Sequence, residues 1–288
     1  MEIRYQDNNV IITNIGDFSL RDTFLCGQVF RFTPLSDNEY LIIAGAECAR
    51  ICQNGESLIF YSTAADKFES FWRSYFDFDR DYTSIRATVS KLGGHVMEKA
   101  AEHGRGIRIL KQDLWETIIS FIISANNNIP RIQKIITALC ENFGNAHTYE
   151  GKTYYSFPDA DSLAHLSVDD LSVIRAGFRA KYILSCAKAV ASGEFDINSL
   201  HHMPTEIAGC ELTKLCGVGP KVRDCILLFA LSRFDVFPVD VWIGRIVSEC
   251  YFDGQEQTSA AVIEFAKSRF GDLCGIAQQY LFHYARNT

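Results

Sequence analysis

The sequence predicts an α+β fold, in which a small antiparallel β-sheet domain at the amino terminus, residues 1–63, packs on a helical body, residues 64–288. Two observations predict this division. The first sixty residues alternate between apolar and polar side chains and are interrupted by Asp37-Asn38 and Asn54-Gly55, which is typical of short strands joined by turns. From Thr63 onward, apolar residues recur at helical spacing, with no long linker between the segments.

The individual elements follow from these two periods. Strands are expected at 9–15, 29–32, 40–44, 47–52 and 57–61. Helices are expected at 64–75, 81–91, 93–103, 113–124, 129–143, 168–175, 181–192, 221–231, 241–251, 259–269 and 276–286. Because no internal repeat or low-complexity segment is present, the sheet and the helices are expected to form one α+β body.

Composition limits the classes of protein to consider. The chain has 288 residues, of which 48% are hydrophobic and 22% are charged, enough to bury a substantial core. No export signal is visible and apolar runs such as 118–125 are too short to span a bilayer, so we expect an intracellular protein that does not bind membranes. The 10 cysteines are scattered without CxxC spacing and are expected to be reduced thiols, mostly in the core.

The charge distribution restricts any nucleic-acid site to part of the surface. The net charge of −7 argues against a protein that wraps DNA over its whole surface, and the acidic excess is concentrated in the first ninety residues. Between Leu171 and Lys188 the chain carries basic residues and no acidic one. This stretch is either a surface that faces phosphates or an ordinary solvated helical face.

A glycine-rich segment, Leu215-Cys216-Gly217-Val218-Gly219-Pro220-Lys221, precedes the helix expected at 221–231. Two glycines around one valine allow a tight hairpin, whose backbone N–H groups and following helix N-terminus can approach a phosphate without obstruction by Cβ atoms. The alternative is an ordinary turn between two helices.

Lys221 and Asp240 are the strongest candidates for catalysis. Asp240 follows Phe237-Pro238-Val239 and opens the helix expected at 241–251, so the starts of two helices can meet. An amine and a carboxylate that face one cavity suit attack at a sugar carbon. The amine attacks in its neutral form, and burial and the positive end of a helix dipole both disfavour the ammonium form. Alternatively, Lys221 is a surface lysine and Asp240 is only an N-cap.

Together these residues closely resemble the helix-hairpin-helix superfamily of DNA glycosylases, whose hairpin lysine is followed about nineteen residues later by an aspartate. The resemblance places the hairpin around 212–231. Further blocks resemble the 8-oxoguanine DNA glycosylases and extend over almost the whole chain. They are Cys26-Gly27-Gln28-Val29-Phe30-Arg31, Ser124-Ala125-Asn126-Asn127-Asn128-Ile129-Pro130-Arg131, Gly177-Phe178-Arg179-Ala180-Lys181-Tyr182 and Ala277-Gln278-Gln279-Tyr280-Leu281-Phe282.

This resemblance implies a base-excision repair enzyme that flips 8-oxoguanine out of duplex DNA. Lys221 would attack the anomeric carbon, and Asp240 would stabilise the developing positive charge and assist proton movement. The product would be a Schiff base, from which β-elimination nicks the strand, so the enzyme would be both glycosylase and lyase and would need no redox cofactor.

The resemblance also implies a pocket for the flipped base. Gln278 and Phe282 lie four residues apart on one helical face, and would offer amide hydrogen bonds and a stacking surface. Cys225, one turn after Lys221, would face the other side of the base, and the Gly27 carbonyl would accept the extra ring N–H of 8-oxoguanine. Without the resemblance, Gln278, Phe282 and Cys225 would be interpreted as core residues.

On the DNA side, the resemblance implies that Asn126 fills the space left by the flipped base, while Arg131 and Arg179 bond the orphaned cytosine. Phe178 would act as the aromatic wedge, a position usually held by tyrosine. Trp242 stands where a phosphate-contacting histidine is more usual, and its indole N–H would make that contact instead. Gly217 and Gly219 would bring the hairpin backbone to the phosphates.

The expected cofactors and partners are few. The carbonyls of Thr213, Leu215 and Val218 match those that hold a structural cation in relatives, and only Cys274 lies where related glycosylases carry an iron–sulfur motif, so no cluster is expected. Lesion-containing double-stranded DNA is the expected partner, and the protein is expected to be a monomer. The alternatives are a related glycosylase for another lesion, or a non-catalytic helix-hairpin-helix module, which would have no use for both Lys221 and Asp240.

Overall fold

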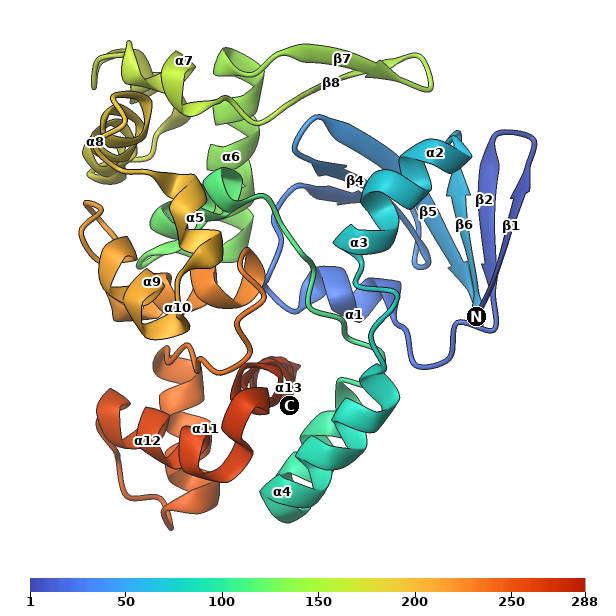
Figure 1. Ribbon diagram of the computed structural model, residues 1–288, viewed down its shortest axis with the longest axis vertical. Helices are drawn as coiled ribbons and strands as arrows, with labels where there is room; N and C mark the ends of the chain where they lie inside the picture. The colour runs from blue at the N-terminus through green and yellow to red at the C-terminus, as the bar shows by residue number, and fades with distance from the viewer. Residues whose placement is uncertain (288) are drawn as a thin grey trace.

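The computed structural model describes residues 1–287 and contains an antiparallel sheet beside a helical body, which confirms the predicted fold class (Figure 1). The sheet has six strands in the order β1-β2-β6-β5-β4-β3. Their bounds are β1 Glu2–Gln6, β2 Asn9–Thr13, β3 Phe32–Pro34, β4 Glu39–Ala44, β5 Glu47–Asn54 and β6 Ser57–Tyr61.

One face of the sheet is buried by a helix and by the segment that follows β6. Helix α1 (Leu20–Leu25) buries Leu20 and Phe24, and the segment after β6 consists of α2 (Ala65–Lys67), a π-helical turn at Phe68–Trp72 and α3 (Arg73–Tyr75). The ring of Phe60 on β6 packs edge-on against Phe68 and Phe76. The core of the sheet therefore continues beyond residue 63 and includes Leu110.

Several elements near the amino terminus differ from the sequence prediction. Strand β1 was not expected, and the strand expected at 29–32 is formed at Phe32–Pro34 instead. Residues 26–31 are a loop that passes between the sheet and the helical body. Helix α1 was also missed, because its six residues are too few to distinguish a helical period from a strand-like one.

The helical body contains two groups of helices (Figure 1). The first group comprises α5 Leu114–Ser124, α6 Ile129–Phe143, α7 Ala160–Ala164, α8 Arg179–Ala191, α9 Thr205–Leu212 and α10 Pro220–Phe229. The second comprises α4 Tyr82–His103, α11 Val241–Tyr251, α12 Ser259–Phe270 and α13 Cys274–Asn287. Short 3-10 helices at Asp170–Ile174, Ile197–His202 and Gly271–Leu273 complete the body.

The main helices begin at the residues that the sequence marks. Asp113, Asn128 and Asp240 each cap a helix by accepting a backbone N–H, and Pro220 occupies the first turn of α10. The two helices expected at 81–91 and 93–103 are one element, α4, interrupted where Gly94 leaves the helical conformation at φ 68°. The helix expected at 168–175 is a 3-10 helix, and α7, α9 and the hairpin of β7 (Ala146–Tyr149) and β8 (Lys152–Tyr155) were not predicted.

A buried ion pair joins the sheet layer to the helical body. Arg31 Nη1 lies 2.9 Å from Glu116 Oε2 on α5, and the Gly45 N–H donates to the same carboxylate at 3.2 Å. Arg31 also donates to the Tyr155 carbonyl on β8. Since a buried charge that loses its partner is costly, this pair fixes the loop of residues 26–31 against α5. Within residues 1–287, no helix has the length and apolar character needed to cross a membrane.

Candidate active site between two groups of helices

A narrow pocket lies where the two groups of helices meet the loop after α1, and the space between its lining atoms and in the solvent at its mouth amounts to about 310 Å³. Its lining comes from α5, α10, the α10–α11 connection, α13 and that loop. The lining residues are Cys26, Gly27, Phe121, Lys221, Cys225, Phe229, Pro238, Asp240, Gln278, Gln279 and Phe282. All six residues that the sequence predicted for catalysis and base binding therefore lie in one pocket.

Lys221 stands in the first turn of α10 and is partly buried. Its Nζ lies 5.1 Å from the centroid of the Phe121 ring on α5. No carboxylate in the described part of the chain lies within 4.0 Å of this amine. The amine is thus held at an aromatic wall of the pocket and is not committed to an ion pair.

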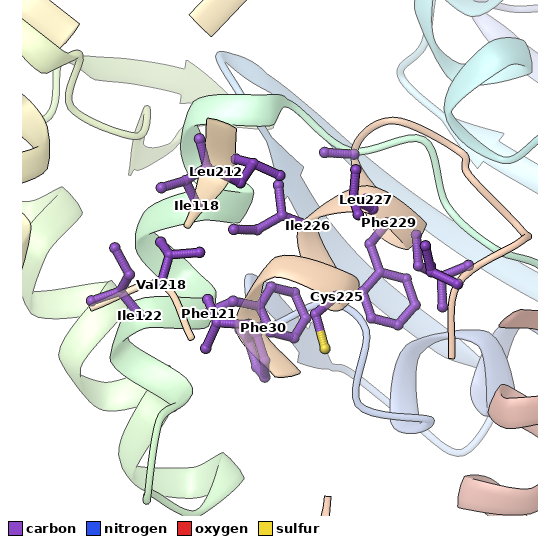
Figure 2. Packing of buried hydrophobic residues seen from close by; sticks show 14 of the residues in the cluster. Phe30, Ile118, Phe121, Ile122, Leu212, Val218, Cys225, Ile226, Leu227 and Phe229 are labelled. Carbon is purple, nitrogen blue, oxygen red and sulfur yellow. The ribbon is translucent and has the colours of Figure 1, made fainter. Parts of the chain in front are cut away.

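Cys225 lies one turn further along α10 and is buried. Burial raises the pKa of its thiol to about 11, while the Lys221 amine beside it acts in the opposite direction. The thiol is therefore neutral near pH 7 and presents a soft apolar surface to the pocket. Figure 2 shows Cys225 among the rings of Phe30, Phe121 and Phe229, of which the last two stack at 5.4 Å.

Asp240 is the N-cap of α11, and its Oδ1 accepts the Ile243 N–H at 2.9 Å. The N-cap interpretation therefore describes the structure, but it does not account for the position of the carboxylate in the pocket that Lys221 also lines. A carboxylate has further lone pairs after accepting one hydrogen bond. Asp240 can consequently cap its helix and act on a bound substrate.

Gly27 occupies a position that only glycine suits. Its φ is 83°, and a Cβ atom there would lie 3.0 Å from Phe282 Cε1. The close packing against Phe282 brings the loop after α1 directly to the face of α13 that lines the pocket. A side chain would both strain the backbone and displace the Phe282 ring.

Gln278 carries the clearest sign of a binding site. The residue is 5% exposed, and its Oε1 is buried without any hydrogen-bond partner among residues 1–287. Leaving a buried polar atom unpaired costs about 1–3 kcal/mol. Such an atom in a pocket indicates that a ligand supplies the missing donor, and Phe282, one turn later on α13, provides an adjacent ring.

A second set of predicted residues surrounds the α5–α6 loop. Asn126 is exposed at the tip of this loop with φ 51°. Arg179, at the start of α8, is only 3% exposed and donates to the carbonyls of Ala125 and Asn126, at 3.0 Å and 2.8 Å. The guanidinium of Arg179 thus supports the backbone that presents Asn126, a role that the sequence did not reveal.

Arg131, Phe178 and Trp242 are exposed side chains. Phe178 is 53% exposed and its ring lies 4.4 Å from the Arg179 guanidinium carbon, while Trp242 is 48% exposed in the first turn of α11. Burial, and then the charge of Arg131, lower the pKa of Arg179. The exposed Phe178 ring beside Arg179 and the nearby charge of Arg131 suit stacking on a base and contact with anionic groups, and Trp242 offers a second exposed ring on α11.

The hairpin between α9 and α10 has the predicted form. Gly217 has φ 88°, and a Cβ atom there would lie 2.8 Å from the Tyr182 ring, whereas Gly219 has open space around it. Gly217 is therefore needed for the turn and its packing, and Gly219 leaves the approach to the N-terminus of α10 free. The Thr213 carbonyl lies at the C-cap of α9, and Leu215 follows in the hairpin, where its carbonyl accepts the Val218 N–H at 3.1 Å.

Five lining residues of the pocket were not predicted, namely Cys26, Phe121, Phe229, Pro238 and Gln279. Cys26 and Gln279 lie inside sequence blocks that were recognised, beside Gly27 and Gln278, so their positions carried a signal. Phe121 lies in a uniformly apolar helix, where nothing in the sequence distinguishes a pocket wall from the core.

Comparison with known proteins agrees with this geometry. Residues 119–271 match the HhH-GPD superfamily of base excision DNA repair proteins, and residues 10–118 match the N-terminal domain of 8-oxoguanine DNA glycosylase. The chain belongs to the 8-oxoguanine DNA glycosylases of the HhH-GPD superfamily. It is accordingly a bifunctional N-glycosylase and DNA lyase of base excision repair.

Individual glycosylases are similar over nearly their whole length. The 8-oxoguanine glycosylase/lyase of Clostridium acetobutylicum, in complex with DNA containing cytosine opposite 8-oxoG, is 37% identical, covers 99% of this chain and 98% of its own, and superposes with a TM-score of 0.95. The structure of MBOgg1 with a low-affinity DNA ligand is 43% identical, with coverage of 99% and 98% and a TM-score of 0.95. A probable N-glycosylase/DNA lyase of Methanothermobacter thermautotrophicus is 30% identical over 95% of both chains.

Proposed function

We propose that this glycosylase binds a flipped 8-oxoguanine in the pocket between α10 and α13, with Lys221 as the nucleophile and Asp240 as the stabilising carboxylate. The observation that carries the proposal is that one pocket contains an amine outside any ion pair, a carboxylate and the unpartnered acceptor of Gln278. A non-catalytic DNA-binding module would need none of the three.

The proposed chemistry follows from these groups. The neutral Lys221 amine attacks the anomeric carbon, the bond from that carbon to the base breaks, and the base leaves with the electron pair and takes up a proton. Asp240 stabilises the positive charge that develops on the sugar. Loss of the amine protons and opening of the sugar ring leave a Schiff base, from which removal of a proton at the next sugar carbon expels the 3′ phosphate.

The proposed recognition uses atoms of α13 and of the loop after α1. Gln278 Oε1 would accept a hydrogen bond from the Watson–Crick edge of the base, which carries N–H donors in 8-oxoguanine. Phe282 and the neutral Cys225 thiol would lie on opposite faces of its ring, and the Gly27 carbonyl would accept the ring N–H that guanine lacks. On the DNA side, Asn126 and Phe178 would enter the duplex, and Arg131, Trp242 and the Gly217–Gly219 backbone would hold the opposite strand and the phosphates. Arg179, which was expected to bond the orphaned cytosine, is buried and donates to backbone carbonyls instead, so we assign it to holding the Asn126 loop.

The same proposal covers the bound cation, the oligomeric state and the cofactor requirement. We propose that the Thr213, Leu215 and Val218 carbonyls of the hairpin hold a structural cation, since carbonyl oxygens are ligands of such ions and the Leu215 carbonyl retains a lone pair after accepting the Val218 N–H. In residues 1–287, no group of three or more His, Cys, Asp or Glu side chains could hold a metal ion. We infer a monomer that works inside the cell, in contact with DNA, and needs no redox cofactor.

The proposed function is tested by borohydride trapping on duplexes that carry either 8-oxoguanine or guanine opposite cytosine. We expect a covalent protein–DNA adduct and release of the base only from the duplex with the lesion. Trapping that is equal on both duplexes, or absent from both, would contradict the proposal.

Replacing Gln278 with alanine should weaken processing of 8-oxoguanine without weakening binding to undamaged duplex. The amide is assigned to the base and not to the backbone, and removal of one good base contact costs about tenfold or more. Single-turnover excision and equilibrium binding to undamaged DNA measure the two effects. Gln133→Ala, on α6 outside the pocket, is the control, and equal losses on damaged and undamaged DNA would place Gln278 in the fold or at a phosphate.

We expect a preference for cytosine opposite the lesion, carried largely by Arg131. Cytosine offers two acceptors to a guanidinium fork, whereas adenine places a donor beside its acceptor, a mismatch worth roughly 1–3 kcal/mol, or about tenfold to a hundredfold. Arg131→Met should therefore reduce the difference in excision rate between cytosine and the other opposite bases. This reduction should be larger than the fall in the rate opposite cytosine itself.

Single-turnover rates on duplexes that differ only in the opposite base decide this prediction. Lys134→Met removes a positive charge one turn later on the exposed side of α6 and should leave the ranking intact. If Arg131→Met keeps the full preference, Arg131 is only a charge that faces phosphates.

A further inference from the structure

Gln279, the residue after the predicted base reader, makes a contact that spans almost the whole chain. The residue is 2% exposed, and its Nε2 donates to the carbonyl of Cys26 at 2.6 Å. This bond joins α13 to the loop after α1, directly before Gly27. The Cys26 thiol beside it is buried, which raises its pKa to about 12, so the thiol stays neutral and does not add a charge to this contact.

The other side of Gly27 is fastened by Gln28, which is fully buried. Its Nε2 donates to the carbonyls of Thr23, at 2.9 Å, and Arg108, at 2.7 Å, while Oε1 accepts the Leu110 N–H at 2.9 Å. The Gln28 carbonyl in turn accepts from Gln112 Nε2 at 2.8 Å. The backbone on both sides of Gly27 is therefore held by glutamine side chains, and Gln279 is the one that comes from the helix that reads the base.

This arrangement bears directly on how lesion and normal base are told apart. A carbonyl can distinguish two bases that differ by one N–H only if its position is fixed, because hydrogen bonds weaken steeply with misalignment. A mobile carbonyl could rotate away from guanine, which lacks the donor, and the penalty for binding guanine would fall. Groups held in advance by buried hydrogen bonds avoid this loss.

We propose that Gln279 is a positioning residue for lesion discrimination: by holding the Cys26 carbonyl, it fixes the Gly27 carbonyl relative to Gln278 on the same helix. This inference rests on the proposed function, in which Gly27 reads the extra N–H of 8-oxoguanine. One helix then determines both the hydrogen bond to the Watson–Crick edge and the position of the group that recognises the lesion.

The first test is Gln279→Leu, which keeps the side-chain volume close to that of glutamine and removes the donor. We expect the ratio of single-turnover excision rates for 8-oxoguanine and guanine to fall about tenfold, the loss of roughly one well-placed hydrogen bond. Strand cleavage at a preformed abasic site should stay within about twofold of wild type, because that substrate has no base for Gly27 to contact.

Trp115→Phe is the matched control. It removes another hydrogen bond from a side-chain N–H to a carbonyl, between Trp115 Nε1 and Pro158, at 2.9 Å and outside the pocket. It should leave the excision ratio unchanged. An unchanged ratio in Gln279→Leu, or an equal fall in excision and in abasic-site cleavage, would overturn the proposal.

Gln279→Glu keeps the shape and covers the case in which the leucine variant does not fold. A protonated carboxyl can donate to the Cys26 carbonyl, whereas a carboxylate cannot, and burial beside a carbonyl favours the protonated form. We expect the excision ratio of this variant to rise toward the wild-type value as the pH falls from about 8 to about 5. The other titratable or charged groups around this contact are Lys221 and Asp240 in the pocket, His283 and Asp22 near the loop, and Arg286, whose guanidinium approaches Gly27. All of them are present in the wild-type protein, so its excision ratio, measured over the same pH range, shows their contribution.

The outcomes separate the two hypotheses. If wild-type protein does not excise 8-oxoguanine, the proposed function fails. If wild-type protein excises it and the glutamate variant shows the same ratio at every pH, the role of Gln279 fails while the proposed function stands.

Discussion

Replacing Lys221 with glutamine is expected to abolish both base release and covalent trapping, while binding to lesion-containing duplex stays measurable. The amide of glutamine cannot form a Schiff base, so no adduct can be reduced by borohydride. The hairpin backbone and the N-terminus of α10, which are proposed to face the phosphates, remain in place. Trapping assays and binding isotherms on the same duplex give both results.

Lys214→Gln is the matched control for this prediction. Lys214 lies in the segment between α9 and α10, seven residues before Lys221, and its Nζ contacts Glu211 at 2.6 Å, so the variant loses an equal charge near the proposed DNA surface. It should be trapped like the wild-type protein. Normal trapping of Lys221→Gln would show that another amine is the nucleophile.

Asp240→Asn is expected to lower excision by about two to three orders of magnitude with little change in melting temperature. The asparagine side chain keeps an oxygen that can accept the Ile243 N–H, so the cap of α11 is preserved, but the negative charge beside the sugar is lost. Thermal unfolding and single-turnover excision separate the two roles.

Asp113→Asn provides the comparison. Asp113 caps α5 in the same manner, with Oδ1 accepting the Glu116 N–H at 2.8 Å, and it does not line the pocket. This variant should keep both its stability and its activity. If Asp240→Asn instead lost stability and kept its chemistry, Asp240 would be only an N-cap.

Much of the fold could be predicted because its signals are local. The periods of 2 and 3.6 residues identified strands β4, β5 and β6 and helices such as α5, α6, α11 and α12 within a few residues. The capping residue Asp240 indicated where α11 begins. Elements of few residues, including α1, α7 and the β7–β8 hairpin, were missed because their lengths are shorter than the window in which a period can be recognised.

Local sequence also identified the candidate chemistry. The hairpin from Leu215 to Lys221 needs glycine at Gly217 for a turn with φ 88°, and this need is visible in the sequence itself. The comparisons confirm the family to which these motifs belong. The roles of the individual residues, Lys221 and Asp240 included, stay predictions until the variants are measured.

By itself, then, the sequence determined the fold class, the main helices and the family, since each depends on residues close together in the chain. The tertiary structure alone decided which atoms meet. It placed Phe121 against Lys221, buried Arg179 beneath the Asn126 loop, left Gln278 Oε1 without a partner and joined Gln279 to Cys26. The physical reason is that these contacts join segments that are far apart in the chain. Whether such segments meet depends on the packing of the entire core, and no local sequence pattern encodes that packing.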